Sequence, residues 1–328
     1  MVAQYFLLYL HFKSLIIMGY KKPIETTRNY LENCPLPNHG KTYTVISHKE
    51  VIDNTLFLLQ HSGFTVTKQM YRCNHNANVA QGIYYIKPNN PDSTITEDET
   101  LGMMFAWTNS YDKSTRFQCA IGAYVKVCYN GMVAGDMLNF KRKHTGSAQH
   151  DVKMQLSNQI KNAEKYYKRV LNDKDLMKNT VLNCTQQAEI AGRLFIEEGI
   201  LDTQQMTCVK SEMDKPTYTY DSINDSAWTF YNHVTHALKK AHPRDWLTDQ
   251  QNFHDFMTAM CNNFSTTNNK YEQFQDDLTT AVSDSVEGVS AVSETIIPEQ
   301  VEEIEVYNFE EEIADADYNN ESDFLLDD

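Results

Sequence analysis

The chain lacks the short motifs that identify many nucleotide-binding and hydrolytic enzymes. No GxxxxGK[ST], GxGxxG, HExxH or GxSxG pattern occurs in its 328 residues. The sequence therefore predicts no phosphate-binding glycine loop, zinc-protease helix or serine-hydrolase elbow. The seven cysteines are scattered and include no CxxC pair, which argues against a disulfide framework and a cysteine-rich zinc site. We expect reduced thiols, no metal and no cofactor.

Basic residues are absent from the end of the chain. Lys270 is the last one, and 18 acidic residues follow between Asp276 and Asp328. The net charge of −15 thus hides a body with 26 acidic and 29 basic residues, a net charge of +3. An acidic segment without counter-charges cannot bury enough apolar surface to fold alone. We therefore predict a disordered acidic tail over residues 271–328.

The predicted tail has an apolar tip. Its last residues are acidic except for one triplet, formed by Phe324, Leu325 and Leu326. Acidic tails with a hydrophobic tip resemble those of single-strand-binding proteins, whose tips dock onto replication or recombination proteins. We interpret the triplet as a partner-docking motif. The alternative is a tail that serves solubility alone.

A long apolar run is also missing. Residues 2–17 are apolar apart from a few polar positions such as His11 and Lys13, and the run is shorter than the about 20 residues that a membrane span needs. It also lacks the basic start and cleavage site of a signal peptide. A buried helix or strand, a membrane anchor and a true start at Met18 remain open, and the ordinary sequence after Met18 favours the last. We treat residues 1–40 as an N-terminal extension and expect no membrane partner.

The periodicity of apolar residues predicts strands first and helices afterwards. Alternation and turn signals predict strands over residues 42–47, 64–72, 81–87, 101–108 and 116–128. Helical spacing predicts helices over residues 48–62, about 149–172, 185–199, 203–213, 225–241 and 246–263. The segments Asn109–Asp112 and Tyr129–Gly131 are predicted as turns. We therefore predict an α+β domain over residues 41–270, with an antiparallel strand-rich N-terminal half, one early helix and a helical C-terminal half.

A basic segment lies where the strands give way to the helices. Between Lys113 and Lys178 there are 13 basic and 5 acidic residues, with aromatic residues interleaved. Basic groups along a backbone and aromatic faces for bases are what single-strand binding requires. The alternative is solvated charges above core aromatics. The predicted nucleic-acid-binding residues are Tyr111, Lys113, Arg116, Lys126, Tyr129, Lys141, Arg142 and Lys143.

Several short motifs occur in a recognisable order. They are Asn109–Ser114 after a strand, Val127–Gly131 after the next, His144–Thr145 before a long helix, and Trp228–Thr235. Over roughly residues 40–245 the chain resembles the phage/plasmid-like protein family, a domain of unknown function. The resemblance implies a mobile-element setting, most simply a bacteriophage protein in the host cytoplasm, and implies no activity. The motif positions that carry over are Asn109, Asp112, Asn130, Gly131 and His144.

Three functions remain open. The first is a non-enzymatic phage DNA-metabolism protein that binds single-stranded DNA and docks partners through its tail. The second is a virion-associated or counter-defence interaction module that binds no nucleic acid. The third is an enzyme with an unrecognised site around Asp112, Asn130 and His144. His233 and His236 share a helical face, but no third metal ligand is apparent, so we expect ordinary histidines there.

Overall fold

The computed structural model describes residues 23–38, 44–89, 98–133 and 148–264. The chain divides into two units, Met1–Gln273 and Phe274–Asp328, and all described residues belong to the first. The predicted acidic tail, including Phe324, Leu325 and Leu326, lies outside the described residues. So do the apolar run at residues 2–17 and the basic cluster of Lys141, Arg142, Lys143 and His144.

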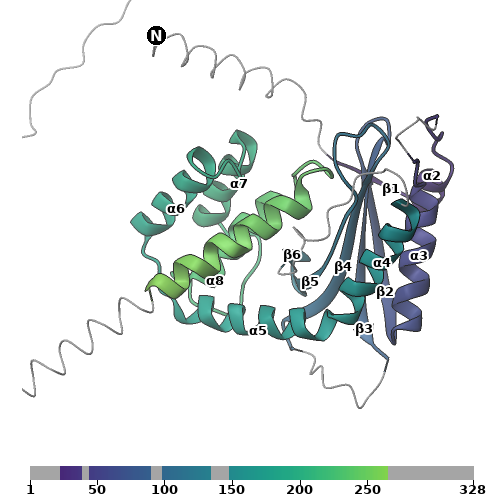
Figure 1. Cartoon of the computed structure of the whole chain (residues 1–328). Coiled ribbons are helices and arrows are strands. Elements are labelled where there is room, and N and C mark those ends of the chain that lie inside the picture. The colour runs from purple at the N-terminus through teal and green to yellow at the C-terminus, as the bar shows by residue number, and fades with distance from the viewer. Residues whose placement is uncertain (1–22, 39–43, 90–97, 134–147, 265–328) are drawn as a thin grey trace, which may run out of the picture. The chain divides into compact units, whose positions relative to one another are not determined.

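A single antiparallel sheet forms the first half of the described chain (Figure 1). Its six strands follow one another in sequence order, each joined to the next by a turn or connection. The predicted antiparallel, strand-rich half is thus confirmed. The strands are β1 (Ile24–Thr26), β2 (Phe64–Cys73), β3 (Val79–Pro88), β4 (Leu101–Ser110), β5 (Gln118–Val125) and β6 (Asn130–Val133).

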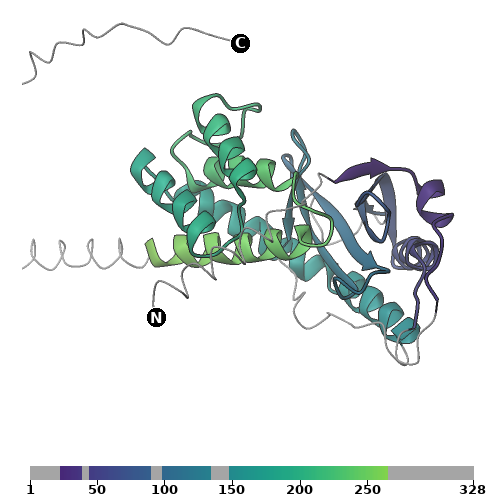
Figure 2. The ribbon, with the colours of Figure 1, turned by 90° about the horizontal axis from the view of Figure 1, so that it is seen from above.

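Helices make up the second half, as predicted, with two more near the start of the chain. Figures 1 and 2 show α3 alongside the sheet and α6 and α7 grouped away from it. Among the described helices, none combines the length and apolar character needed to cross a bilayer. The helices are α2 (Arg28–Glu32), α3 (His48–His61), α4 (Ala148–Lys161), α5 (Ala163–Asn179), α6 (Cys184–Ile196), α7 (Thr203–Asp214), α8 (Ala227–Leu238) and a last one over residues 246–264.

The two faces of the sheet are covered differently. One face carries Cys119, Ile121 and Ala123, as strand alternation predicts, and packs in the main core with residues of α3, α4 and α5. The opposite face packs in a smaller cluster, in which Trp246 and Leu247 cover part of the sheet. Within the described residues, a pocket lies on this second face of the sheet.

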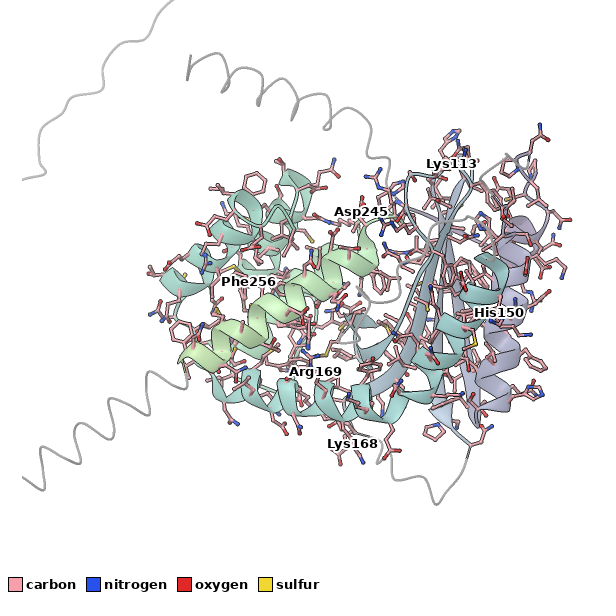
Figure 3. The ribbon with its side chains drawn as sticks, viewed as in Figure 1. Lys113, His150, Lys168, Arg169, Asp245 and Phe256 are labelled. Carbon is pink, nitrogen blue, oxygen red and sulfur yellow. The ribbon has the colours of Figure 1, made fainter. Side chains whose placement is uncertain are left out.

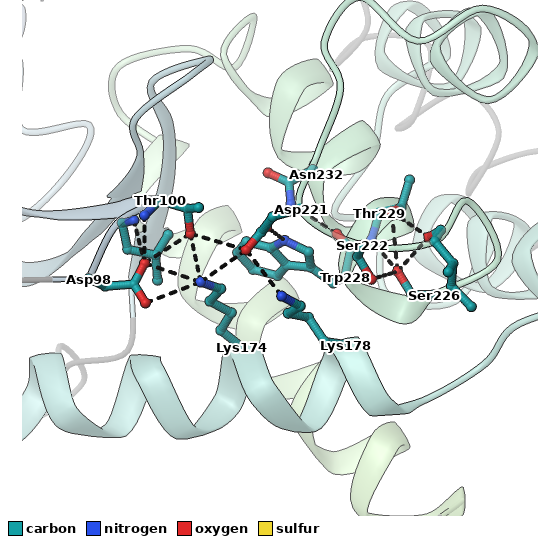
Figure 4. A network of polar contacts seen from close by, with 12 residues as sticks. Asp98, Thr100, Lys174, Lys178, Asp221, Ser222, Ser226, Trp228, Thr229 and Asn232 are labelled. Carbon is teal, nitrogen blue, oxygen red and sulfur yellow. Dashed lines mark hydrogen bonds and ion pairs between the residues drawn. The ribbon is translucent and has the colours of Figure 1, made fainter.

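A polar network ties the sheet to the helices (Figure 4). Lys174 of α5 is almost fully buried and lies 3.1 Å from Asp98 Oδ1 and 3.3 Å from Asp221 Oδ2. Asp98 precedes β4, and Asp221 accepts a hydrogen bond from Trp228 Nε1 of α8 at 2.9 Å. One lysine thus links a strand, a helix and the loop before another helix.

Four local predictions were wrong. Thr44–Ser47 forms no strand; Ile46 is buried, its carbonyl accepts a hydrogen bond from Asn109, and Ser47 caps α3. The helix predicted over residues 149–172 is two helices, because the side chain of Asn162 bonds back to the carbonyl of Asn158.

The other two errors concern turns. Asn109 and Ser110 belong to β4, so that turn begins later than predicted. Asn130 and Gly131 belong to β6, and the chain reverses over residues 126–129 instead. The N-terminal extension, residues 1–40, contains β1 and α2.

Candidate nucleic-acid interface

A pocket of about 370 Å³ opens on the partly covered face of the sheet. We call it the sheet pocket. Residues from five strands (β1, β2, β3, β4 and β6), from the turn before β6 and from the segment after α8 line it. Its four basic side chains face one acidic side chain, Glu25. The lining residues are Pro23, Glu25, Lys68, Met70, Arg72, Ile83, Tyr85, Met104, Tyr129, Gly131, Lys239, Lys240 and Trp246.

Arg72 is the buried cation of this pocket, with 5% of its surface exposed. Its Nε donates to Gln81 Oε1 at 2.8 Å, its Nη2 donates to the same oxygen, and its Nη1 donates to the carbonyl of Lys239 at 2.8 Å. All these acceptors are neutral. Within the part of the chain that the structure describes, no carboxylate forms an ion pair with this guanidinium.

Burial lowers the pKa of Arg72 to about 10, so the guanidinium keeps its charge at neutral pH. Tyr85 and then Glu25, which lies opposite Arg72 in the β1–β2 register, oppose this shift of the pKa without reversing it. A buried charge without a counter-ion is costly unless a ligand supplies one. An anionic ligand, to which a guanidinium can donate two parallel hydrogen bonds, meets this need.

Two tyrosines of the pocket lining, Tyr85 and Tyr129, pack with a third, Tyr124, which lies outside that lining. The rings of Tyr124 and Tyr129 are parallel to within 3°, with centroids 5.5 Å apart, and Tyr85 meets both edge-on at 4.6 and 5.0 Å. Lys68 Nζ lies 4.1 Å from the centroid of Tyr129. Tyr129 is 44% exposed, so part of its ring is accessible for stacking.

The backbone of Tyr129 is unusual. Its φ is 58°, in the left-handed region that a bulky side chain rarely adopts. This conformation costs about 1–2 kcal/mol relative to the right-handed one. Strained backbone of this kind is concentrated at binding sites, and here it presents the ring beside Lys68.

The motif residue Gly131 lets the pocket wall approach the sheet. A Cβ at this position would lie 2.9 Å from Cζ2 of Trp246 and 3.1 Å from Cε of Met104. Trp246 therefore packs against bare backbone, and it also lies under Arg72, whose Cζ is 5.3 Å from the indole ring. The neighbouring Asn130 is buried and donates to the carbonyl of Asn232 at 3.0 Å, which fixes β6 against α8.

The motif residue Asn109 belongs to a buried network away from the pocket. Its Nδ2 lies 3.0 Å from His48 Nδ1, and His48 Nε2 lies 3.0 Å from the carbonyl of Ala77. Asn109 Nδ2 can only donate, so the neutral tautomer with the proton on Nε2 satisfies both contacts. Tyr111 stacks on His48 at 3.9 Å and is 5% exposed. Its ring is therefore part of the core and has no face for a base.

The predicted basic residues that the structure describes, Lys113, Arg116 and Lys126, do not share one surface. Lys113 and Arg116 lie exposed at the turn between β4 and β5, while Lys126 donates to the carbonyl of Asp98 at 2.7 Å. In Figure 3, Lys113 lies near the top of the drawn side chains, and Lys168, another lysine of the basic segment, lies near the bottom. Of the predicted nucleic-acid-binding residues, Tyr129 lines the sheet pocket and Lys126 lines a second, smaller hollow.

The residues of the enzyme hypothesis do not converge. Asp112 follows β4 near the start of β5, whereas Asn130 pairs with Val125 at the end of β5. The eight residues of β5 span about 23 Å at about 3.3 Å per residue. Asp112 and Asn130 therefore cannot act on one reacting group, and His144 lies outside the described residues.

The histidine pair on α8 faces a carboxylate that sequence spacing did not reveal. Glu212 of α7 lies 4.0 Å from His233 Nδ1 and 3.7 Å from His236 Nε2. Burial lowers the pKa of His233 to about 4, so its ring is neutral at neutral pH. No group of three or more potential ligands among the described residues is arranged to hold a metal.

Sequence reasoning missed most of the sheet pocket. Lys68, Met70 and Arg72 alternate along β2, which places all three on one face. This signal could have been found, but Lys239, Lys240 and Trp246 join them only through the tertiary fold.

The structure is that of an α+β protein with a pocket on one face of its sheet, lined by basic and aromatic residues. A family model described as a domain of unknown function, DUF932, matches residues 35–281, and the chain belongs to this family. No curated protein and no solved structure matches the chain.

Proposed function

We propose that this protein binds single-stranded nucleic acid in the sheet pocket. The observation that carries the proposal is the buried Arg72, whose hydrogen-bond acceptors are all neutral and which lines the same pocket as the partly exposed Tyr129. Phosphate satisfies the arginine, and a base stacks on the tyrosines. Single strands offer both groups at once, whereas a duplex hides its base faces.

The dimensions and charge of the pocket support this ligand. Its volume of about 370 Å³ lies in the range of small-molecule sites. Lys68 and Lys240 are exposed at its edge, where they can contact further phosphates without being desolvated. Stacking contributes about 1–3 kcal/mol per base and tolerates any sequence, so we expect little base preference.

The biological setting is part of the proposal. The resemblance to phage/plasmid-like proteins supports a role in phage or plasmid DNA metabolism. The apolar triplet at the end of the acidic segment supports docking of replication or recombination proteins there. Both rest on sequence alone.

The test is a fluorescence-anisotropy titration of the full chain with a labelled oligothymidylate at several salt concentrations. The double variant Lys68→Ala/Lys240→Ala removes two exposed charges from the pocket. We expect binding to weaken at least about tenfold. The slope of log affinity against log salt should fall by about 1.4, at about 0.7 per lost phosphate contact.

The matched control is Lys153→Ala/Lys165→Ala, which removes two exposed charges from α4 and α5. It should bind as the original chain does. An equal loss in the control would show general charge attraction and contradict the proposal. Absence of binding by the original chain at low salt would also contradict it. Tighter binding of a hairpin duplex than of the oligothymidylate would contradict single strands as the ligand and indicate double strands instead.

A further inference from the structure

A second hollow of about 170 Å³ lies at one end of the sheet. Its lining includes Tyr124, which packs against the smaller cluster, and also Ile86, Met103 and Tyr167 of the main core. It is formed where β3 ends, β4 begins and β5 ends. Its polar lining includes Thr67, Lys87, Lys126 and Tyr124. Lys87 is exposed, and within the described residues it forms no ion pair. We call this hollow the strand-end subsite.

Tyr124 connects the two hollows. It lines the strand-end subsite, and its ring contacts Tyr85 and Tyr129 of the sheet pocket. The ring lies directly on β4, because a Cβ on Gly102 would come within 2.4 Å of Tyr124 Cε1. Because Gly102 has no side chain, the ring of Tyr124 can pack against the backbone of β4 and still contact Tyr85 and Tyr129.

Basic side chains are spaced along the sheet from the sheet pocket towards the strand-end subsite. Lys68 is four residues from Arg72 on β2, about 13 Å at about 3.3 Å per residue. Tyr85 pairs with Lys68, and Lys87 lies two residues further along β3, about 7 Å beyond. Arg72, Lys68 and Lys87 therefore mark a line of about 20 Å along one sheet face.

We infer that the two hollows form one track for an oligonucleotide, with the strand-end subsite holding the nucleotides that follow those in the sheet pocket. This inference rests on the proposed function. The length of the line exceeds one nucleotide, so the ligand class is an extended single strand and not a mononucleotide. Lys87 contacts a phosphate, and Tyr124 forms the wall between the subsites.

The experiment measures the affinity of the full chain for thymidine monophosphate and for oligothymidylates from the dinucleotide to the octanucleotide. Affinity should rise with length until the track is filled. The variant Lys87→Ala should leave binding of the monophosphate unchanged and weaken binding of the longest ligand about five- to tenfold. The control Lys210→Ala, on the exposed face of α7, should change neither.

Two results would overturn the track. The first is an affinity that no longer rises beyond the mononucleotide. The second is a Lys87→Ala variant that binds every length as the original chain does. In both cases the ligand still binds, so the proposed function survives while the track fails. If no ligand of any length binds, both proposals fail.

Discussion

At the scale of single residues, Tyr129 combines an unfavourable backbone with an exposed ring. We predict that Tyr129→Asn weakens oligonucleotide binding but leaves the stability of the fold nearly unchanged. Asparagine tolerates the left-handed conformation, which offsets the packing lost against Tyr85 and Tyr124. The free energy of unfolding should change by less than about 1 kcal/mol. Oligonucleotide binding should weaken about fivefold or more, because one stacking face is lost.

The measurements are chemical denaturation and the anisotropy titration. Tyr30→Asn is the control, since Tyr30 is exposed on α2 and lies outside the pocket; it should leave binding unchanged. A Tyr129→Asn protein that binds normally would show that the strained turn has no role in ligand binding.

At the scale of elements, Lys174 links α5 to β4 and to the loop before α8. Lys174→Met would leave Asp98 and Asp221 without their shared cation. Fully buried pairs lose about 3–5 kcal/mol when one partner is removed. Both carboxylates are partly exposed, so we predict a smaller destabilisation of about 2 kcal/mol.

Denaturation with urea at neutral pH measures this loss. Lys178→Met removes a neighbouring cation that is about one-third exposed, and it should cost less than half as much. Hydrogen bonds from Thr100 and Leu101 outweigh burial and hold the pKa of Asp98 below its usual value. The stability from this carboxylate is thus present above about pH 4 and is lost as the pH falls through the folded-state pKa. Equal effects of the two variants would show that Lys174 is not the central link.

The elements also show what sequence could predict. Four of the six strands follow from alternation and turn signals, because the strands are long and each turn has its own polar residues. β6 was missed because it has four residues and its Asn-Gly pair imitates a turn. The break at Asn162 depends on one side-chain hydrogen bond, which periodicity does not register.

The site was harder to predict than the fold. Charge counting along the chain pointed to residues 113–178, yet the basic side chains of this range that the structure describes are spread over several surfaces. The pocket instead combines Arg72 of β2 with residues after α8, which are more than 160 positions apart, as in the bond from Arg72 to the carbonyl of Lys239. Only the tertiary fold brings such residues together, so patterns of neighbouring residues in the sequence cannot predict their contact.

At the scale of the whole molecule, charge is distributed unevenly along the chain. The body has a net charge of +3, and the residues after Asn269 contain the acidic run. We predict that truncation after Asn269 tightens oligonucleotide binding, because 18 negative charges on the same chain repel a polyanion. The gain should be largest at low salt. It should diminish as salt rises to about 0.15 M, where the screening length is about 8 Å.

Two full-length variants separate charge from the apolar tip. Replacing the acidic residues after Asn269 by asparagine and glutamine keeps the length and removes the charge, so it should match the truncation. Replacing Phe324, Leu325 and Leu326 by serine keeps the charge, so it should leave oligonucleotide affinity unchanged. Anisotropy titrations of all four proteins at two salt concentrations make the comparison. A truncation that weakens binding would mean that the acidic segment contributes to nucleic-acid recognition, and the electrostatic account of it would then be wrong.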